Sequence, residues 1–330
     1  MPQRESGDMR PVVVVLGTGG TIAGRAARPD DLVSYAAGEV PVAELVSGLT
    51  GQGGYSVESE QVAQVDSKDM DLPVWQSLCR RVVHHLSRPE VSGVVITHGT
   101  DTIEETAYVL QAMTGPTKPV VLTCAMRPAT ALAPDGPQNL ADALVLARHA
   151  GAQGVMVVCA GKIHGPAEVT KVHTYRLDAF DSGDAGPLGV IEHGQVRVWR
   201  DWPGQGSTGV ADLRQRLPAF LELTSMPRVE LLFSHACADG LLVRALQADN
   251  HAQGAQRLMG LVVAGTGNGS LHHLLQDALV QAQRAGVRVV RSSRCAHGRV
   301  QPADGDLLES MGGLSPVKAR LALALDLIEH

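Results

Sequence analysis

Two short runs of the sequence combine hydroxyl side chains with glycine in a way that could support nucleophilic chemistry. The first run is Gly17-Thr18-Gly19-Gly20-Thr21 and the second is Thr97-His98-Gly99-Thr100-Asp101. Glycine permits sharp turns and lets another group approach the backbone amides closely. Each run can therefore present a threonine hydroxyl beside N–H groups, which is what a hydroxyl nucleophile and an oxyanion pocket require.

The elements that would position these runs are two buried strands. Residues 12–16 are five apolar residues, four of them β-branched, and residues 94–97 form a second β-branched run. After the second run, Thr102 and Glu105 have the spacing of a capping box at the start of a helix. Ligands of open α/β sheets bind at the carboxyl ends of the strands, so both threonine loops are predicted to lie at that edge.

The two runs alone leave several interpretations open. The first could be a tight strand-to-helix turn without chemistry, a dinucleotide-binding loop, or a loop that holds a nucleophile. A dinucleotide loop needs Gly-x-Gly-x-x-Gly, and counting from Gly17 the third glycine position is occupied by Ile22. In the second run, Thr100 and Asp101 could do no more than cap a helix.

The runs also resemble the two signatures of the bacterial L-asparaginase family. The matching segments are Thr18-Gly19-Gly20-Thr21-Ile22-Ala23-Gly24 and residues 98–107, which begin His98-Gly99-Thr100-Asp101-Thr102. The resemblance continues, in order and over nearly the whole chain, at Ala125-Met126-Arg127-Pro128, Asp135-Gly136-Pro137, Val169-Thr170-Lys171, Gly267-Asn268-Gly269 and Ser292-Ser293-Arg294.

The resemblance implies five catalytic residues: Thr21, Tyr35, Thr100, Asp101 and Lys171. In such a site Thr21 attacks the substrate amide, and Tyr35 comes from a lid loop that closes over it. Lys171 acts on the hydroxyl of Thr100 or on a water molecule, while Asp101 either completes that group or accepts the substrate's α-ammonium. Which threonine forms the ester stays open.

The substrate-binding residues that the resemblance implies are Gly20, Ser67, Gly99, Thr100 and Asp101. Ser67 matches a serine that contacts the substrate's α-carboxylate. The next position often holds glutamine in the family, whereas this chain has Lys68, which could pair with a carboxylate or point to solvent.

The resemblance further implies a homo-oligomer, a tetramer built as a dimer of dimers, in which a neighbouring subunit completes each site. The family's neighbour-subunit glutamate falls near Gly305 in this shorter segment, so Asp304 or Asp306 could substitute for it. No cofactor is implied. The paired histidines have no second ligand set at a metal-binding spacing, so no metal is predicted.

The composition limits the classes of partner and the cellular compartment that we expect for this protein. The chain has 330 residues, a formal net charge of −6 and no Lys/Arg run, which argues against nucleic acid and acidic membranes as main partners. No long apolar stretch predicts a membrane span, and the polar first ten residues do not read as a signal peptide. Five widely spaced cysteines favour reduced thiols in the cytoplasm.

The predicted fold is α/β, with a larger N-terminal domain whose mainly parallel sheet is flanked by helices and a smaller C-terminal α/β domain. Expected domains are residues 1–200 and 213–330, joined by a Gly/Pro-rich linker at 201–212. Predicted strands are residues 12–16, 93–97, 120–124, 155–159, 229–233, 261–264 and 287–290. Ser315 and Pro316 have the residue types of a helix start.

These observations predict an enzyme that converts L-asparagine and water to L-aspartate and ammonia through a threonine acyl-enzyme. The alternatives are a glutaminase-asparaginase of broad specificity, an amidase acting on a larger molecule, a nucleotide-binding oxidoreductase, and a non-catalytic amino-acid-binding protein on the same scaffold.

Overall fold

A computed structural model describes residues 10–31, 35–49, 54–204, 209–249 and 257–329. The chain divides into two compact units, one within residues 1–181 and 187–208 and the other within 182–186 and 209–330. The α/β class, the larger N-terminal sheet and the smaller C-terminal sheet are confirmed. The short segment 182–186 belongs to the second unit although it precedes the end of the first.

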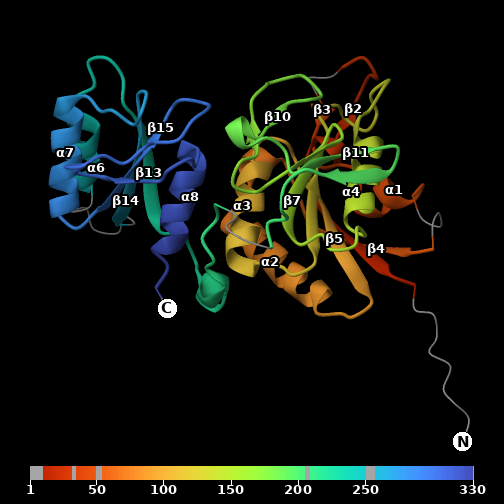
Figure 1. Ribbon diagram of the computed structural model, residues 1–330. Helices are drawn as coiled ribbons and strands as arrows, with labels where there is room; N and C mark the ends of the chain where they lie inside the picture. Colours follow the sequence, from red (N-terminus) through yellow and green to blue (C-terminus); the bar gives the residue numbers. More distant parts are fainter. Residues whose placement is uncertain (1–9, 32–34, 50–53, 205–208, 250–256, 330) are drawn as a thin grey trace, which may run out of the picture. The chain divides into compact units, whose positions relative to one another are not determined.

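The N-terminal unit is built on an eight-stranded sheet (Figure 1). In spatial order its strands are β12 (Gln195–Val198), β11 (Gly189–Glu192), β8 (Lys162–His164), β7 (Gly154–Cys159), β6 (Pro119–Thr123), β5 (Val91–Thr97), β1 (Val12–Gly19) and β4 (Ser56–Val65). The five strands from β7 to β4 are parallel, and the other three run antiparallel to their neighbours.

Helices cover both faces of this sheet, as Figure 1 shows. They are α1 (Val42–Val46) and α4 (Gly136–Leu146) on one face, and α2 (Leu72–Leu86) and α3 (Ile103–Thr114) on the other. The central strands read as continuous apolar runs because both of their faces are buried. Burying one valine side chain stabilises the folded state by about 1.5–3 kcal/mol. The strand ends are therefore firmly held supports for the loops.

The chain reverses its direction of travel across the sheet at β1, which lies between β4 and β5. The loop after β1 leads to α1 on one face, and the loop after β5 leads to α3 on the opposite face. A crevice opens at such a switch point, outside the carboxyl ends of the strands. Both threonine runs of the sequence lie there.

Two small hairpins decorate the N-terminal unit. One pairs β2 (Arg25–Ala26) with β3 (Tyr35–Ala36), and the other pairs β9 (Thr170–Lys171) with β10 (Phe180–Asp181). Single turns of 3-10 helix, η1 (Thr21–Ala23) and η2 (Ser67–Asp69), follow β1 and β4.

The C-terminal unit has a four-stranded parallel sheet in the order β13 (Arg228–Phe233), β14 (Leu258–Gly265), β15 (Arg288–Ser293) and β16 (Glu309–Ser310). Helices α6 (Leu241–Asp249) and α7 (His273–Arg284) pack in one apolar cluster, and α8 (Pro316–Asp326) packs in another. Short elements η3 (Gly183–Ala185), η4 (Arg214–Arg216) and α5 (Leu217–Glu222) complete it. The Ser315 hydroxyl accepts a hydrogen bond from the Lys318 N–H and caps α8, as predicted.

All seven predicted strands are present, with ends that differ by a few residues. The capping-box prediction is wrong. The Thr102 hydroxyl caps nothing on α3 and instead donates to the Ser67 carbonyl at 2.7 Å, because that long-range acceptor lies within reach. Within the described residues, no helix is both long enough and apolar enough to cross a membrane.

Candidate active site

The loop after β1 reaches its shape through two glycines with positive φ. Gly19 has φ +100° and Gly20 has φ +77°, a region that side-chain-bearing residues avoid. The Gly20 N–H donates to the Val65 carbonyl at 2.9 Å, which ties the loop to the end of β4. The next residue, Thr21, begins η1 and is buried.

Tyr35 lies against this loop, at the start of β3. Its hydroxyl is 2.7 Å from the Thr21 hydroxyl, so the two oxygens share a hydrogen bond. The β2–β3 hairpin that carries Tyr35 is held by Thr130, whose hydroxyl accepts from the Ala26 N–H at 2.8 Å and lies 3.4 Å from the Ala26 carbonyl.

The segment that bears Thr130 is shaped by Asp135. Its two carboxylate oxygens accept the N–H groups of Met126 at 2.9 Å and Arg127 at 3.0 Å. The Arg127-Pro128 and Asp135-Gly136-Pro137 segments therefore act as scaffold for the hairpin that carries Tyr35.

The two threonine loops touch each other through glycine. A methyl group added at Gly20 would lie 2.3 Å from the Cα of Gly99, and one added at Gly99 would lie 2.4 Å from the Ser67 hydroxyl. No side chain fits at such distances. The two glycines therefore allow Thr21 and Thr100 to start from backbones in direct contact.

Thr100, Asp101 and Lys171 form a second polar group. The Lys171 ammonium donates to the Thr100 hydroxyl at 2.7 Å and to the Asp101 carboxylate at 2.6 Å. Thr100 is buried, the Lys171 side chain is 18% exposed and that of Asp101 is 52% exposed. Glu104 of α3 accepts the Lys171 N–H at 3.4 Å and helps to hold this strand end beside the loop.

Ser67 lies beneath the β5 loop and is almost fully buried. Its hydroxyl accepts the Asp101 N–H at 3.2 Å. Lys68 turns away into its own turn, where it pairs with Asp66 at 2.6 Å and Asp69 at 3.2 Å while 62% exposed. These two carboxylates raise the pKa of Lys68, which keeps it cationic.

His98 is a residue of this region to which the sequence analysis assigned no role. It is fully buried, and burial lowers the pKa of its imidazole to about 4. Its Nδ1 is 2.7 Å from the Gly99 carbonyl and its Nε2 is 2.8 Å from the Thr106 hydroxyl. A signal was present in the sequence, because His98 follows a buried strand and directly precedes a candidate catalytic loop.

The Gly267-Asn268-Gly269 segment and the two aspartates that could replace the neighbour-subunit glutamate lie in the C-terminal unit. Asn268 forms two hydrogen bonds with the backbone of Gln301, at 2.7 and 3.1 Å. Asp306 pairs with Arg291 and also accepts the Ala303 N–H, whereas Asp304 is exposed. The Asp306 carboxylate is therefore already occupied within its own unit.

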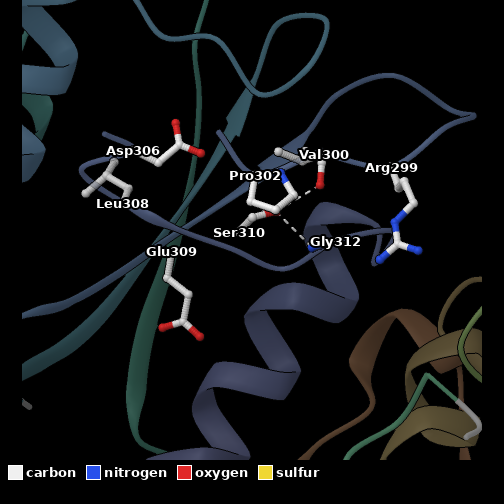
Figure 2. A pocket seen from close by; sticks show the side chains of 8 residues that line it. All are labelled: Arg299, Val300, Pro302, Asp306, Leu308, Glu309, Ser310 and Gly312. Carbon is white, nitrogen blue, oxygen red and sulfur yellow. Dashed lines mark hydrogen bonds between the residues drawn. The ribbon is translucent and has the colours of Figure 1, made fainter. Parts of the chain in front are cut away.

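A hollow of about 540 Å³ lies on the C-terminal unit (Figure 2). Its lining residues are Arg299, Val300, Pro302, Asp306, Leu308, Glu309, Ser310 and Gly312. In Figure 2 the two carboxylates point apart, and each pairs with an arginine, Asp306 with Arg291 and Glu309 with Arg288. The hollow therefore has no convergent acid group. Across the described part of the chain, no three His, Cys, Asp or Glu side chains are grouped to hold a metal ion.

The fold and the loops define a class: a two-domain α/β protein in which two threonine-bearing loops meet at the switch point of the larger sheet. Residues 12–203 match the family model described as asparaginase, N-terminal, and residues 228–329 match the glutaminase/asparaginase C-terminal domain. The chain belongs to the asparaginase family.

Individual relatives agree over nearly the full length. L-asparaginase 2 of Escherichia coli (strain K12) is 35% identical over 97% of this chain and 89% of that protein. Glutaminase-asparaginase of Pseudomonas fluorescens biotype A is 33% identical over 94% of this chain and 84% of that protein. The crystal structure of a probable cytoplasmic L-asparaginase from Campylobacter jejuni superposes with a TM-score of 0.84 at 36% identity, covering 97% and 96% of the two chains.

Proposed function

We propose that this protein hydrolyses the side-chain amide of L-asparagine to L-aspartate and ammonia through a threonine acyl-enzyme. The names of its relatives support the substrate class. The observation that carries the proposal is that each buried threonine hydroxyl is hydrogen-bonded to an ionisable side chain. Thr21 has Tyr35 at 2.7 Å, and Thr100 has Lys171 at 2.7 Å.

In the first half-reaction the Thr21 oxygen attacks the amide carbon. As the Thr21 proton moves to the Tyr35 oxygen, the phenol's own proton moves on to the amide nitrogen, the C–N bond breaks, and ammonia leaves. A threonine ester remains. Backbone N–H groups of Thr100 and of the Gly20 loop stabilise the negative oxygen that forms meanwhile, and one such donor is typically worth about 3 kcal/mol.

In the second half-reaction water attacks the ester and releases aspartate. Lys171 withdraws a proton from that water, directly or through the Thr100 hydroxyl. A base must be neutral, so Lys171 must release a proton before it can act. Its nitrogen lies 2.7 Å from the Thr100 hydroxyl and 2.6 Å from the Asp101 carboxylate, so the three groups form one hydrogen-bonded set. The same geometry permits the reverse assignment, with Thr100 as the ester-forming residue. Mass spectrometry of an enzyme trapped with a reactive amide analogue distinguishes the two.

The substrate's polar ends have assigned partners in this proposal. Ser67, Gly20 and Gly99 bind the α-carboxylate side, and Asp101 accepts the α-ammonium with its exposed carboxylate oxygen. Lys68 adds a nearby positive charge but stays paired with Asp66 and Asp69.

Glutamine is the second substrate to test, because three similar relatives are named glutaminase-asparaginase. Asparagine and glutamine differ by one methylene, which a pocket separates by only about 1–3 kcal/mol. We expect asparagine to be preferred. A non-catalytic binding role is disfavoured because both threonines keep their hydrogen-bond partners.

The proposal includes a homotetramer built as a dimer of dimers, with the neighbour's C-terminal unit completing each site. Light scattering coupled to size-exclusion chromatography measures the mass directly. A monomer that releases ammonia at full rate would contradict the completed-site arrangement.

We further propose a cytoplasmic location. All five cysteines are free thiols, and three of them are buried. Burial raises the pKa of Cys79 to about 12, and the hydrogen bond with Cys159 together with burial raises that of Cys124. Such thiols are unreactive and suit a reducing compartment. One relative is named a probable periplasmic L-asparaginase, so cell fractionation is the deciding measurement.

The experiment that tests the function is ammonia release by the purified protein with L-asparagine and, separately, with L-glutamine. A Thr21→Ala variant is the control. Rapid release that the variant lacks supports the proposal, and absence of release from the folded wild-type protein overturns it.

A further inference from the structure

A directed chain of hydrogen bonds ends on the loop that carries Thr100. The indole Nε1 of Trp75 is 3.0 Å from the Thr106 hydroxyl, and that hydroxyl is 2.8 Å from His98 Nε2. His98 Nδ1 is in turn 2.7 Å from the Gly99 carbonyl. Helices α2 and α3 thus reach the β5 loop through one buried imidazole.

Every proton in this chain is fixed by chemistry. A carbonyl only accepts, so His98 Nδ1 must donate to Gly99. A neutral imidazole has a single N–H, so Nε2 accepts from the Thr106 hydroxyl. An indole only donates, so the same hydroxyl accepts from Trp75. His98 is therefore held as one tautomer in one orientation.

The Gly99 carbonyl belongs to the same peptide unit as the Thr100 N–H. That peptide is trans, so the N–H points away from the imidazole, opposite to the carbonyl. Across the described ranges, the Thr100 N–H donates to no other group of the protein. Hydrogen bonds in series polarise one another, so a donor on the carbonyl makes the opposite N–H a stronger donor.

We propose that His98 is a positioning residue for the reaction: through the Gly99 carbonyl it orients and polarises the Thr100 N–H toward the oxyanion of the transition state. The inference rests on the proposed amide hydrolysis and deepens it. His98 itself touches no reacting atom. Its effect belongs to the transition state, where negative charge develops, and changes ground-state binding little.

Two variants separate this role from mere packing. In His98→Asn the side-chain amide nitrogen takes the place of Nδ1 and can still donate to Gly99. In His98→Gln the amide nitrogen takes the place of Nε2, which faces Thr106, and the donor to Gly99 is lost. Each variant removes one of the two hydrogen bonds of His98, so both lower the melting temperature.

The matched control is His85→Gln. His85 is a second buried histidine of the same unit, 2.9 Å from Glu60, where it joins α2 to β4 away from the threonine loops. Its loss lowers the melting temperature and leaves kcat and KM unchanged.

The measurement is kcat and KM for L-asparagine, with melting temperatures, for the wild type, His98→Asn, His98→Gln and His85→Gln. We expect kcat to fall about tenfold in His98→Gln, less than the loss of a whole oxyanion donor, and by no more than about twofold in His98→Asn. KM should stay within about threefold in both, because the contacts that bind the substrate equally in the ground state and the transition state are unchanged.

Two different failures can be told apart. Equal kcat values in the two His98 variants, or the lower value in His98→Asn, overturn the role of His98 while wild-type turnover keeps the proposed function intact. A wild-type protein that releases no ammonia overturns both.

Discussion

The two threonine loops of the larger sheet hold their hydroxyls in different ways. Thr21 meets the neutral phenol of Tyr35, which comes from a hairpin of two-residue strands. Thr100 meets the Lys171 ammonium, which also pairs with Asp101. One hydroxyl therefore sits in a neutral pair and the other in a charged network, although both follow buried parallel strands.

The supports behind the two partners differ as well. The hairpin that carries Tyr35 rests on Thr130 and on a few backbone bonds, such as the Leu132 N–H to the Pro29 carbonyl at 3.2 Å. The Thr100 loop rests on buried strands, on Ser67 and on the imidazole of His98. The geometry at Thr21 thus depends on a lightly anchored segment, and the geometry at Thr100 depends on the core. This contrast can be tested by removing groups one at a time.

The largest effect should follow removal of either hydroxyl. Thr21→Ala and Thr100→Val should each lower kcat by about a thousandfold or more. Removing one residue of a cooperating catalytic group costs about as much as removing several. The double variant should be little worse than either single one. Stopped assays of ammonia release measure the rates, and near-wild-type turnover in one single variant would show that only the other loop is catalytic.

Lys171→Met tests the charged network. It removes the amine that is hydrogen-bonded to Thr100 while keeping most of the length of the side chain, so kcat should fall by about a hundredfold to ten-thousandfold. KM should change far less. Steady-state kinetics separate the two constants, and a raised KM with unchanged kcat would assign Lys171 to binding.

Tyr35→Phe tests the neutral pair. Loss of the phenol hydroxyl leaves the ring and removes the hydrogen bond to Thr21, so kcat should fall about a hundredfold. Tyr175→Phe is the matched control, because that ring is 58% exposed. Similar kcat values in the wild type and in Tyr35→Phe would show that a group other than Tyr35 transfers the proton of Thr21.

Thr130→Val tests the light anchoring of the hairpin. The change keeps the side-chain shape but leaves the Ala26 N–H without its partner, which typically costs about 1 kcal/mol. We expect kcat/KM to fall about fivefold, and Thr174→Val, at an exposed site, to change nothing. An unchanged kcat/KM in Thr130→Val would mean that the hairpin is anchored by its backbone alone.

The smallest effect concerns stability away from the loops, where Arg88 forms two hydrogen bonds with Glu58 of β4. This pairing lowers the pKa of Glu58 below its ordinary value. A lowered pKa in the folded state gives stability that is present above the ordinary pKa and is lost as pH falls through the folded value. Urea midpoints of Glu58→Gln and wild type should therefore differ slightly at about pH 6, and the difference should shrink as the pH falls below the ordinary pKa of a glutamate. A difference in urea midpoint that grows as the pH falls would contradict this sign. The kcat values of the two proteins at neutral pH should be equal.

Much of the fold was predictable because its strands are buried on both faces. The apolar runs of β1, β5, β6 and β7 stand out against their polar flanks. Strand β4 was missed because it is an edge strand whose exposed positions carry Ser, Glu and Gln. The antiparallel strands β8, β11 and β12 were missed because three or four residues give too short a pattern.

The candidate site divides in the same way. Thr21 and Thr100 follow from local sequence, since a hydroxyl after glycines at a strand end is visible in one window. Lys171 lies 71 residues from Thr100, and its place beside that hydroxyl follows from no local pattern, only from resemblance to a family. Tyr35 could likewise be predicted as a site residue only from the resemblance to the family. His98 was overlooked because a buried neutral histidine looks like any core residue.

The contact between Gly20 and Gly99 has a consequence for anyone who would diversify this protein by directed evolution. Each position excludes even alanine, because a methyl group at Gly20 would meet the backbone of Gly99 and one at Gly99 would meet the Cβ and hydroxyl of Ser67. Compensating for a substitution at Gly20 would require the loop of Gly99 to move, and that loop carries Thr100. A randomised library at these two codons should return glycine at both, so mutational effort is better spent on the hairpin and on the turn around Lys68.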